Sequence, residues 1–232
     1  MRRGSGRTGE RTGILGRIAR TIRKNLHKHQ PFQSSEDFWI KRYRYGGNSG
    51  SGSYDKLAAF KAEVINDFVA EHAIRSVIEY GCGDGNQLSL ATYQEYTGFD
   101  VSPEAIRQCR QLFAGDASKS FHLMPDYADE QAELTLSLDV IYHLVEDRVY
   151  GEYMNRLFDS ATRFVIIYSS NREQAADARA PHVRHREFTA WIAANRPDWA
   201  LLQHIPNRYP FDPQDRYSSF ADFYIYAKPG GS

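Results

Sequence analysis

An apolar stretch that runs directly into alternating glycines constrains the fold of this chain more than any other feature. Residues 76–88 read SVIEYGCGDGNQL, with Gly81, Gly83 and Gly85 at every second position after the apolar run. Glycines in such a turn let the backbone pass close beneath a ligand. The pattern predicts a strand, a glycine-rich turn and a helix, with a ligand site at the turn.

Apolar strands and amphipathic helices alternate along most of the chain. We expect helices over residues 54–71, 86–92, 102–113, 147–160 and 185–196, and strands over 75–81, 96–101, 120–124, 132–141, 163–170, 199–205 and 221–228. Ser102 and Pro103 suit the N-cap and first position of the third helix. This alternation predicts an α/β protein with a doubly wound, mostly parallel sheet and helices on both faces.

Composition narrows the class of protein. A length of 232 residues with 41% hydrophobic residues suits one α/β domain with some additional chain. No apolar run approaches the ~20 residues that span a bilayer, and no apolar signal segment follows the first Met. The two cysteines, Cys82 and Cys109, are not in a CxxC pair. We therefore expect a reduced, cytoplasmic compartment.

The charge is divided unevenly along the chain. Residues 1–30 contain nine Lys or Arg and one acidic residue, a net charge of +8, whereas the whole chain has a formal net charge of zero. We interpret residues 1–30 as a basic tail and residues 31–232 as the ligand-binding domain. The domain is net acidic and carries no nucleic-acid-binding motif, so we expect no nucleic-acid substrate.

Apolar residues recur every four positions within the tail. Ile14, Ile18, Ile22 and Leu26 alternate with basic residues, which predicts a basic amphipathic helix over residues 13–29. Such a helix suits peripheral contact with an anionic membrane surface. A helix docked on the domain or on a partner protein, and an organelle transit segment, are alternatives that the pattern does not separate.

The spacing of the glycines separates two classes of ligand. A dinucleotide site reads G-x-G-x-x-G, and counting from Gly81 its third glycine falls on Asn86. Glu79, just before the turn, is also an unfavourable neighbour for a pyrophosphate. A nicotinamide oxidoreductase is therefore disfavoured, and the acid favours a cationic ligand.

The sequence EYGCGDG, residues 79–85, resembles the first motif of the class I S-adenosylmethionine-dependent methyltransferases. Asp100, which ends the next expected strand in YTGFDVS, matches the acid that holds the ribose hydroxyls in that family. LSLDVIYHLVED, residues 136–147, looks like the wall beside the transferred methyl group. The resemblance covers about residues 54–228 and implies a seven-stranded Rossmann-like sheet.

The resemblance also implies S-adenosylmethionine as the cofactor, with S-adenosylhomocysteine as its product. The residues that it places at the cofactor are Glu79, Gly81, Cys82, Gly83, Asn86, Asp100, Val101, Asp126, Tyr127 and Leu138. Among these, Asp126 would face the adenine amine with Tyr127 near the ring. An ordinary loop acid is the alternative for Asp126.

A glycine- and serine-rich stretch, residues 46–53, precedes the first long helix. It lacks the G-K-[ST] ending of a phosphate-binding loop, and no strand precedes it. In the family that it resembles, this region covers the cofactor cleft, so we interpret the stretch as a lid or cofactor-contacting loop; a flexible linker is the alternative. Arg42, Arg44 and Lys61 are each candidates to meet the cofactor's carboxylate.

Histidines and arginines follow the fourth and fifth expected strands, at the edge where α/β sheets bind ligands. His143 is the first candidate for a general base, and His182 and His185 are alternatives. Arg184 and Arg186 are candidates for binding an anionic substrate group, and Tyr209 for an aromatic wall of the pocket. Packing on neighbouring elements or plain solvent exposure is the alternative for these residues. No third ligand accompanies His182 and His185, so we expect no metal.

Together these features predict a methyltransferase that transfers a methyl group in line to an acceptor hydroxyl with a His base. We expect O-methylation of a sugar or glycan of the surface-polysaccharide type. The alternatives are methylation of another small molecule, and a non-catalytic cofactor-binding module that acts through a partner.

Overall fold

The computed structural model describes residues 31–174 and 178–230. The predicted basic helix over residues 13–29 lies outside this part of the chain. The helices are α2 (Ser35–Arg44), α3 (Asp55–Glu71), α4 (Pro103–Leu112), α5 (Asp147–Asp159) and α6 (Phe188–Asn195). The strands are β1 (Ser76–Tyr80), β2 (Glu95–Asp100), β3 (Lys119–Leu123), β4 (Ala132–Leu138), β5 (Ala161–Ser169), β6 (Ala200–Ile205) and β7 (Asp222–Ala227).

The strands form one seven-stranded sheet in the order β3-β2-β1-β4-β5-β7-β6. Neighbouring strands from β3 to β5 are parallel, and β7 runs antiparallel to both β5 and β6. The order reverses between β1 and β4, and crevices at such reversals bind ligands in open α/β sheets. The predicted doubly wound, mostly parallel sheet is confirmed.

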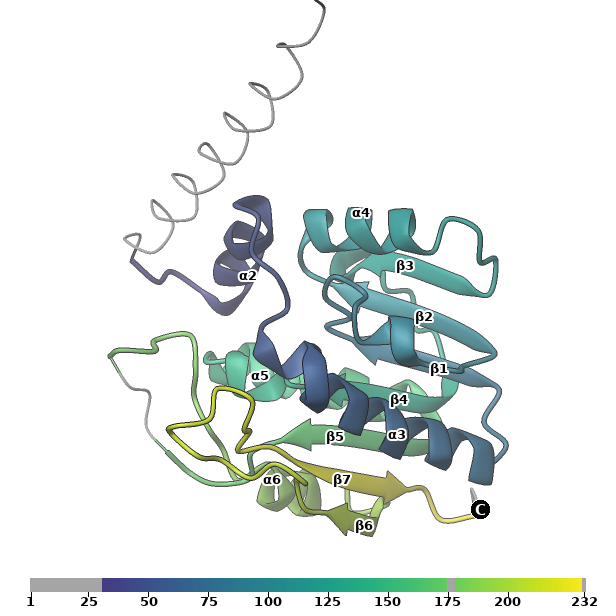
Figure 1. Cartoon of the computed structure of the whole chain (residues 1–232). Helices are drawn as coiled ribbons and strands as arrows, with labels where there is room; N and C mark the ends of the chain where they lie inside the picture. Colours follow the sequence, from purple (N-terminus) through teal and green to yellow (C-terminus); the bar gives the residue numbers. More distant parts are fainter. Residues whose placement is uncertain (1–30, 175–177, 231–232) are drawn as a thin grey trace, which may run out of the picture.

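Helices cover both faces of the sheet (Figure 1). One core cluster joins Phe60 and Phe68 of α3 and Ile106 of α4 to strand residues such as Leu134. The other joins Met154 of α5 and Ile192 of α6 to the opposite strand faces. Successive strand side chains point to opposite faces, so buried apolar runs such as β5 supply both clusters.

Two helix ends follow their local sequence signals. Ser102 caps α4 by accepting a hydrogen bond from the Ala105 amide at 3.3 Å, with Pro103 at the first helical position, as predicted. The helix that sequence analysis left out is α2. Its side-chain cap is Ser34, which accepts a hydrogen bond from the Asp37 amide at 3.1 Å, and basic residues occupy its last turn.

The helix predicted over residues 86–92 is only a 3₁₀ turn, Leu88–Leu90. Asn66 of α3 explains the early end: its side chain donates to the Leu90 carbonyl at 2.9 Å and accepts from the Thr92 amide at 3.1 Å. These bonds satisfy backbone groups that a longer helix would have used. Across the described residues, no helix has the length and apolar character needed to cross a bilayer.

Candidate active site

A cavity of about 600 Å³ opens at the carboxyl ends of β1 and β4, where the strand order reverses. This volume lies in the range of small-molecule sites, ~300–1,000 Å³. Its wall includes the glycine turn after β1, the segment after β4, the start of α5 and the helix α2, which lies beside this edge of the sheet (Figure 1). Predicted residues in the wall are Glu79, Gly81, Cys82, Gly83, Asp100, Val101, Leu138 and His143.

The glycine turn needs glycine at two of these positions. Gly81 has φ +82° and Gly83 has φ +61°, a left-handed region that side chains disfavour. A Cβ atom on Gly81 would lie 2.6 Å from a methyl carbon of Val140, so the β1 turn and the segment after β4 approach each other closely. The turn is held to β2 as well, because the Gly83 amide donates to Asp100 at 3.0 Å.

The glycine- and serine-rich stretch is fastened to the glycine turn. The Ser49 amide donates to the Asp84 carboxylate at 3.0 Å, and the Asp84 amide donates to Ser49 Oγ at 3.0 Å. Tyr54 also donates to this carboxylate, at 2.7 Å. Ser49 and Ser53 line the cavity. A cofactor-contacting loop is expected to be bonded to the glycine turn in this way, whereas a flexible linker needs no such bonds. The contacts therefore favour the loop interpretation.

Four charged side chains with little exposed surface are among the residues that line the cavity. The Lys61 ammonium lies 2.7 Å from Asp139 Oδ2, with the lysine side chain 0% exposed and the aspartate 12% exposed. Glu79 and Asp100 are the other two. Among the described residues, the whole lining holds six acidic residues and three Lys or Arg, so it is net acidic, which suits a ligand with a positive sulfonium and a zwitterionic amino-acid end. By donor set and volume, these residues fit S-adenosylmethionine.

Of the three basic candidates for the cofactor's carboxylate, only Lys61 lines the cavity. Arg42 instead donates to the Asn48 carbonyl at 2.6 Å, within the loop after α2, and Arg44 is exposed.

Burial perturbs both acids of the glycine-turn region. It raises the pKa of Glu79 to about 7, although a hydrogen bond from the Tyr96 hydroxyl at 2.6 Å opposes the shift. Burial likewise raises the pKa of Asp100 to about 6, against the amides of Ser102 and Gly83, which favour the carboxylate. Each group loses hydration without gaining a full countercharge. A bound cation would favour their ionised forms.

His143 is the histidine after β4 that lines the cavity. Its Nδ1 lies 3.0 Å from the His182 carbonyl oxygen. A carbonyl only accepts, so Nδ1 carries the proton of the neutral ring and Nε2 keeps a lone pair. Among the described residues, no hydrogen bond to Nε2 accompanies this one. Desolvation lowers the pKa of His143 to about 4, so the ring is neutral at pH 7.

The two alternative histidines have other neighbours. The His182 ring stacks on Phe38 of α2 at a centroid distance of 4.1 Å, and its backbone orients His143. His185 is buried, with Nδ1 2.6 Å from Ser170 Oγ and its ring against Phe220. Neither is among the described residues that line the cavity. The geometry therefore favours His143 as the group that meets a ligand.

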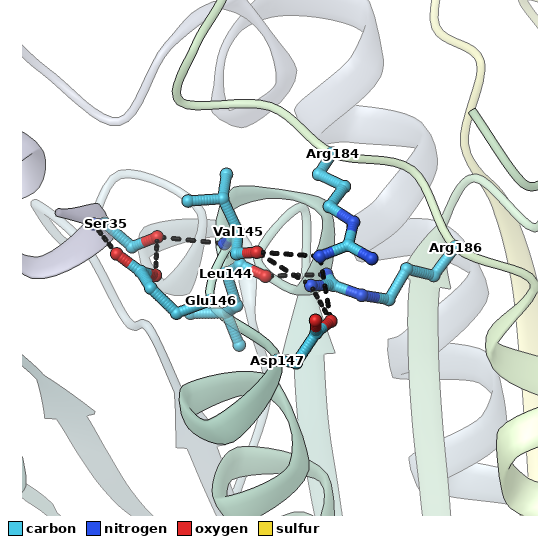
Figure 2. Close-up of polar contacts among 7 residues, drawn as sticks. All are labelled: Ser35, Leu144, Val145, Glu146, Asp147, Arg184 and Arg186. Atoms are coloured by element: carbon cyan, nitrogen blue, oxygen red, sulfur yellow. Dashed lines mark hydrogen bonds and ion pairs between the residues drawn. The ribbon is translucent and has the colours of Figure 1, made fainter. Parts of the chain in front are cut away.

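Arg184 and Arg186 contact the segment after β4 from outside and are not among the described residues that line the cavity. Arg186 donates to the carbonyls of Leu144 at 2.6 Å and Val145 at 2.9 Å, and both arginines pair with Asp147 (Figure 2). These bonds engage their guanidinium groups within the protein. An anion-binding role for either arginine stays a prediction.

Four further candidates lie outside the cavity wall among the described residues. Asn86 donates to the Ser53 carbonyl at 2.6 Å, and the Tyr127 hydroxyl bonds Ser160 Oγ at 2.8 Å. Asp126 is exposed, while its neighbours Met124 and Pro125 line the cavity. Tyr209 packs edge-on against Phe60 at 6.3 Å. Their predicted ligand contacts stay predictions.

The cavity also has a wall that sequence analysis missed. Trp39 and Tyr43 of α2 line it, and the Trp39 ring meets His143 edge-on at 4.9 Å. The Tyr43 hydroxyl bonds Ser49 Oγ at 2.8 Å. The signal for α2 is present in the sequence: SSEDFWIKRYR carries a serine cap, acids in the first turn and bases in the last.

Strand order, glycine turn and cavity together define the fold of the class I S-adenosylmethionine-dependent methyltransferases, and the predicted resemblance is confirmed. Residues 78–166 match a family model described as a methyltransferase domain. No curated protein sequence matches the chain at a significant level.

Solved structures share the fold at low sequence identity. N-methyltransferase NodS from Bradyrhizobium japonicum WM9, in complex with S-adenosyl-L-homocysteine, has a TM-score of 0.63 at 15% identity, over 85% of this chain and 100% of that one. Magnesium protoporphyrin IX methyltransferase from Synechocystis PCC 6803, with bound SAM, has a TM-score of 0.55 at 12% identity, over 97% and 100%. The methyltransferase domain of bacterial CtHen1 has 0.57 at 18% identity, over 72% and 96%.

Proposed function

We propose that this protein is an S-adenosylmethionine-dependent O-methyltransferase in which His143 is the general base. The observation that carries the proposal is the cavity itself. It brings the glycine turn, the ribose-binding candidate Asp100 and a neutral imidazole with a free lone pair to one edge of the sheet. The family match over residues 78–166 and the cofactor-bound neighbours support the cofactor.

The residues assigned to the cofactor follow from the lining. Asp100 would accept hydrogen bonds from the ribose hydroxyls, since its carboxylate is fixed by the Gly83 and Ser102 amides. Lys61 and Asp139 would hold the carboxylate and the ammonium of the amino-acid end. Their present ion pair keeps two opposite charges side by side, ready for a zwitterion.

S-adenosylmethionine, when bound, supplies an activated methyl group: the acceptor oxygen forms a bond to its carbon while the carbon–sulfur bond breaks and leaves its electron pair on sulfur. His143 takes the hydroxyl proton on Nε2, and Nδ1 keeps its own proton on the His182 carbonyl. The low pKa keeps the base form available well below pH 7. General-base catalysis of this kind contributes about 10²–10⁴-fold.

We infer a hydroxyl acceptor on a sugar or other small molecule. A hydroxyl acceptor needs a base to remove its proton, and the neutral His143 can be that base. A neutral amine acceptor needs no base, because its lone pair can attack the methyl group directly. The Trp39 ring lies beside His143 in the same cavity and offers an apolar surface to the carbon face of a sugar ring. The net acidic domain also makes a polyanionic acceptor less favourable.

Calorimetric titration tests the cofactor assignment. The intact protein is titrated with S-adenosylmethionine and S-adenosylhomocysteine, beside Asp100→Ala and the control Asp67→Ala, an exposed acid on α3. We expect micromolar binding that only Asp100→Ala weakens, by about tenfold or more because hydrogen bonds to a charged group are lost. Failure of the folded protein to bind either compound would reject the proposal.

A second experiment tests the base and the acceptor. Radiolabelled methyl donor is incubated with panels of sugars, oligosaccharides, phenols and amines, using wild type and His143→Gln. We expect label on a hydroxyl compound, and a loss of about 10²-fold or more in turnover for His143→Gln at unchanged cofactor affinity. Label on amines alone would overturn the hydroxyl acceptor. Cofactor binding with no transfer to any panel would favour a binding module that acts through a partner.

A further inference from the structure

The segment that carries the proposed base, residues 143–147 after β4, is held along almost its whole length by residues 182–186 after β5. At its start, the Arg184 amide donates to the Tyr142 carbonyl at 2.8 Å, and His143 Nδ1 donates to the His182 carbonyl at 3.0 Å. Two stretches 39 residues apart in sequence therefore lie side by side next to the cavity, joined by hydrogen bonds.

Arg186 makes the central contacts between these two stretches. One of its terminal nitrogens donates to the Leu144 carbonyl at 2.6 Å, and the other to the Val145 carbonyl at 2.9 Å (Figure 2). Its side chain is 10% exposed and lies over the Tyr150 ring at 4.4 Å. One planar, rigid guanidinium group thus donates to two adjacent carbonyls at once, and among the side chains only arginine has such a group.

The opposite side of the segment is fixed by α2. Ser35 Oγ donates to Glu146 at 2.6 Å and accepts from the Val145 amide at 3.0 Å (Figure 2). The Ser35 amide adds a bond to the same carboxylate at 3.0 Å. The backbone of residues 144–146 is therefore bounded on both sides, and a shift of its carbonyls moves the adjoining His143.

We propose that Arg186 is a positioning residue for His143. By fixing the Leu144 and Val145 carbonyls, it keeps the His143 ring within reach of the His182 carbonyl, which sets the proton on Nδ1 and leaves Nε2 as the acceptor. The catalytic consequence rests on the proposed function of His143. The structural consequence, the tautomer of His143, does not.

The chain offers a matched control in Arg196. Its side chain is 19% exposed, pairs with Asp159 at 2.8 Å and donates to the Asn155 carbonyl at 3.1 Å, at the far end of α5. Its Nε, like that of Arg186, is buried without a partner among the described residues. Removing this arginine removes a similar set of bonds without touching residues 143–147.

The experiment compares Arg186→Met, Arg186→Lys and Arg196→Met. The tautomer of His143 is read in cofactor-free protein by long-range nitrogen–hydrogen NMR, with its signals assigned by their loss in His143→Gln. We expect the Nδ1–H form in wild type and Arg196→Met, and mixed tautomers in Arg186→Met. Arg186→Lys, which keeps one bond, should be intermediate and remains informative if the Met variant fails to fold.

Kinetics give the second readout. We expect Arg186→Met to lower kcat by about 10- to 100-fold, as for a misplaced catalytic group, with acceptor KM and cofactor Kd changed less than about threefold. An unchanged tautomer in both Arg186 variants would overturn the positioning role, whatever the activity. A changed tautomer with full activity of His143→Gln would instead reject the base and leave the positioning of His143 intact.

Discussion

Replacing Lys61 by Met should destabilise the protein far more than the loss of an ordinary surface ion pair. The lysine side chain is 0% exposed, so its removal leaves the Asp139 carboxylate in the cavity wall without its countercharge. Breaking a buried pair from one side costs about 3–5 kcal/mol. Asp139 keeps the Tyr142 hydroxyl at 3.0 Å and is 12% exposed, which places the expected cost near the lower end, about 3 kcal/mol.

Urea unfolding followed by circular dichroism measures this loss of unfolding free energy. In a thermal scan, the same loss should lower the melting temperature by about 6–12 °C for a domain of this size. Lys56→Met is the control, because the Lys56–Asp215 pair is 37% and 38% exposed and should contribute less than about 1 kcal/mol.

The double variant Lys61→Met with Asp139→Asn completes the cycle. It removes both charges, so we expect it to be more stable than Lys61→Met alone. A Lys61→Met protein within about 0.5 kcal/mol of wild type, or a double variant whose loss equals the sum of the two single losses, would refute the idea that these two charges depend on each other.

Four further predictions concern the glycine turn and its neighbours. Gly83→Ala should abolish cofactor binding in calorimetry while leaving a folded protein, because its Cβ would collide with Ser49 Oγ and with the Tyr43 hydroxyl at 2.9 Å. Cofactor affinity should fall by up to about tenfold per pH unit below pH 6 as Asp100 takes up a proton, and Asp100→Asn should flatten this dependence. The same raised pKa has the opposite sign for folding: the Asp100 contribution to stability is lost as pH rises through about 6, so the cofactor-free protein should gain stability from this group on acidification. Ser102→Ala should cost about 1 kcal/mol in urea unfolding through loss of the α4 cap.

The parts of this structure that sequence analysis predicted are those set by local requirements. Gly81 and Gly83 are needed because the turn has positive φ values, and Ser102 with Pro103 is a pair that favours a helix start by local geometry alone. Apolar strands that alternate with helices predict a mostly parallel sheet, because each helix connects two parallel strands and covers one apolar face of the sheet. The glycine turn, Asp100, Leu138 and His143 therefore lie where the pattern puts them.

The parts that were not predicted depend on partners distant in the chain. Arg184 and Arg186 sit in a stretch that is typical of anion binding, yet their guanidinium groups meet backbone carbonyls after β4. Lys61 and Arg42 are equal candidates for the cofactor's carboxylate in the sequence. The fold places Lys61 in the cavity wall and leaves Arg42 outside it. Asp126 and Tyr127 follow β3 as expected, but the 3₁₀ turn Met124–Asp126 presents Met124 and Pro125 to the cavity instead.

The position of β7 between β5 and β6 makes the outer strand depend on the inner one for its place in the sheet. β6 precedes β7 in the chain but lies outside it, and its described strand partner is β7 alone. Among the described residues, β6 therefore joins the sheet only through β7, whether the two strands pair before or after β7 docks along β5. In native-state hydrogen exchange, the amides that β6 donates to the ladder can open by fraying of β6 alone, while the β5–β7 ladder stays closed. Lower protection of β6 than of the β5–β7 ladder indicates fraying of the edge strand, and higher protection indicates that β6 and β7 leave β5 as one paired unit.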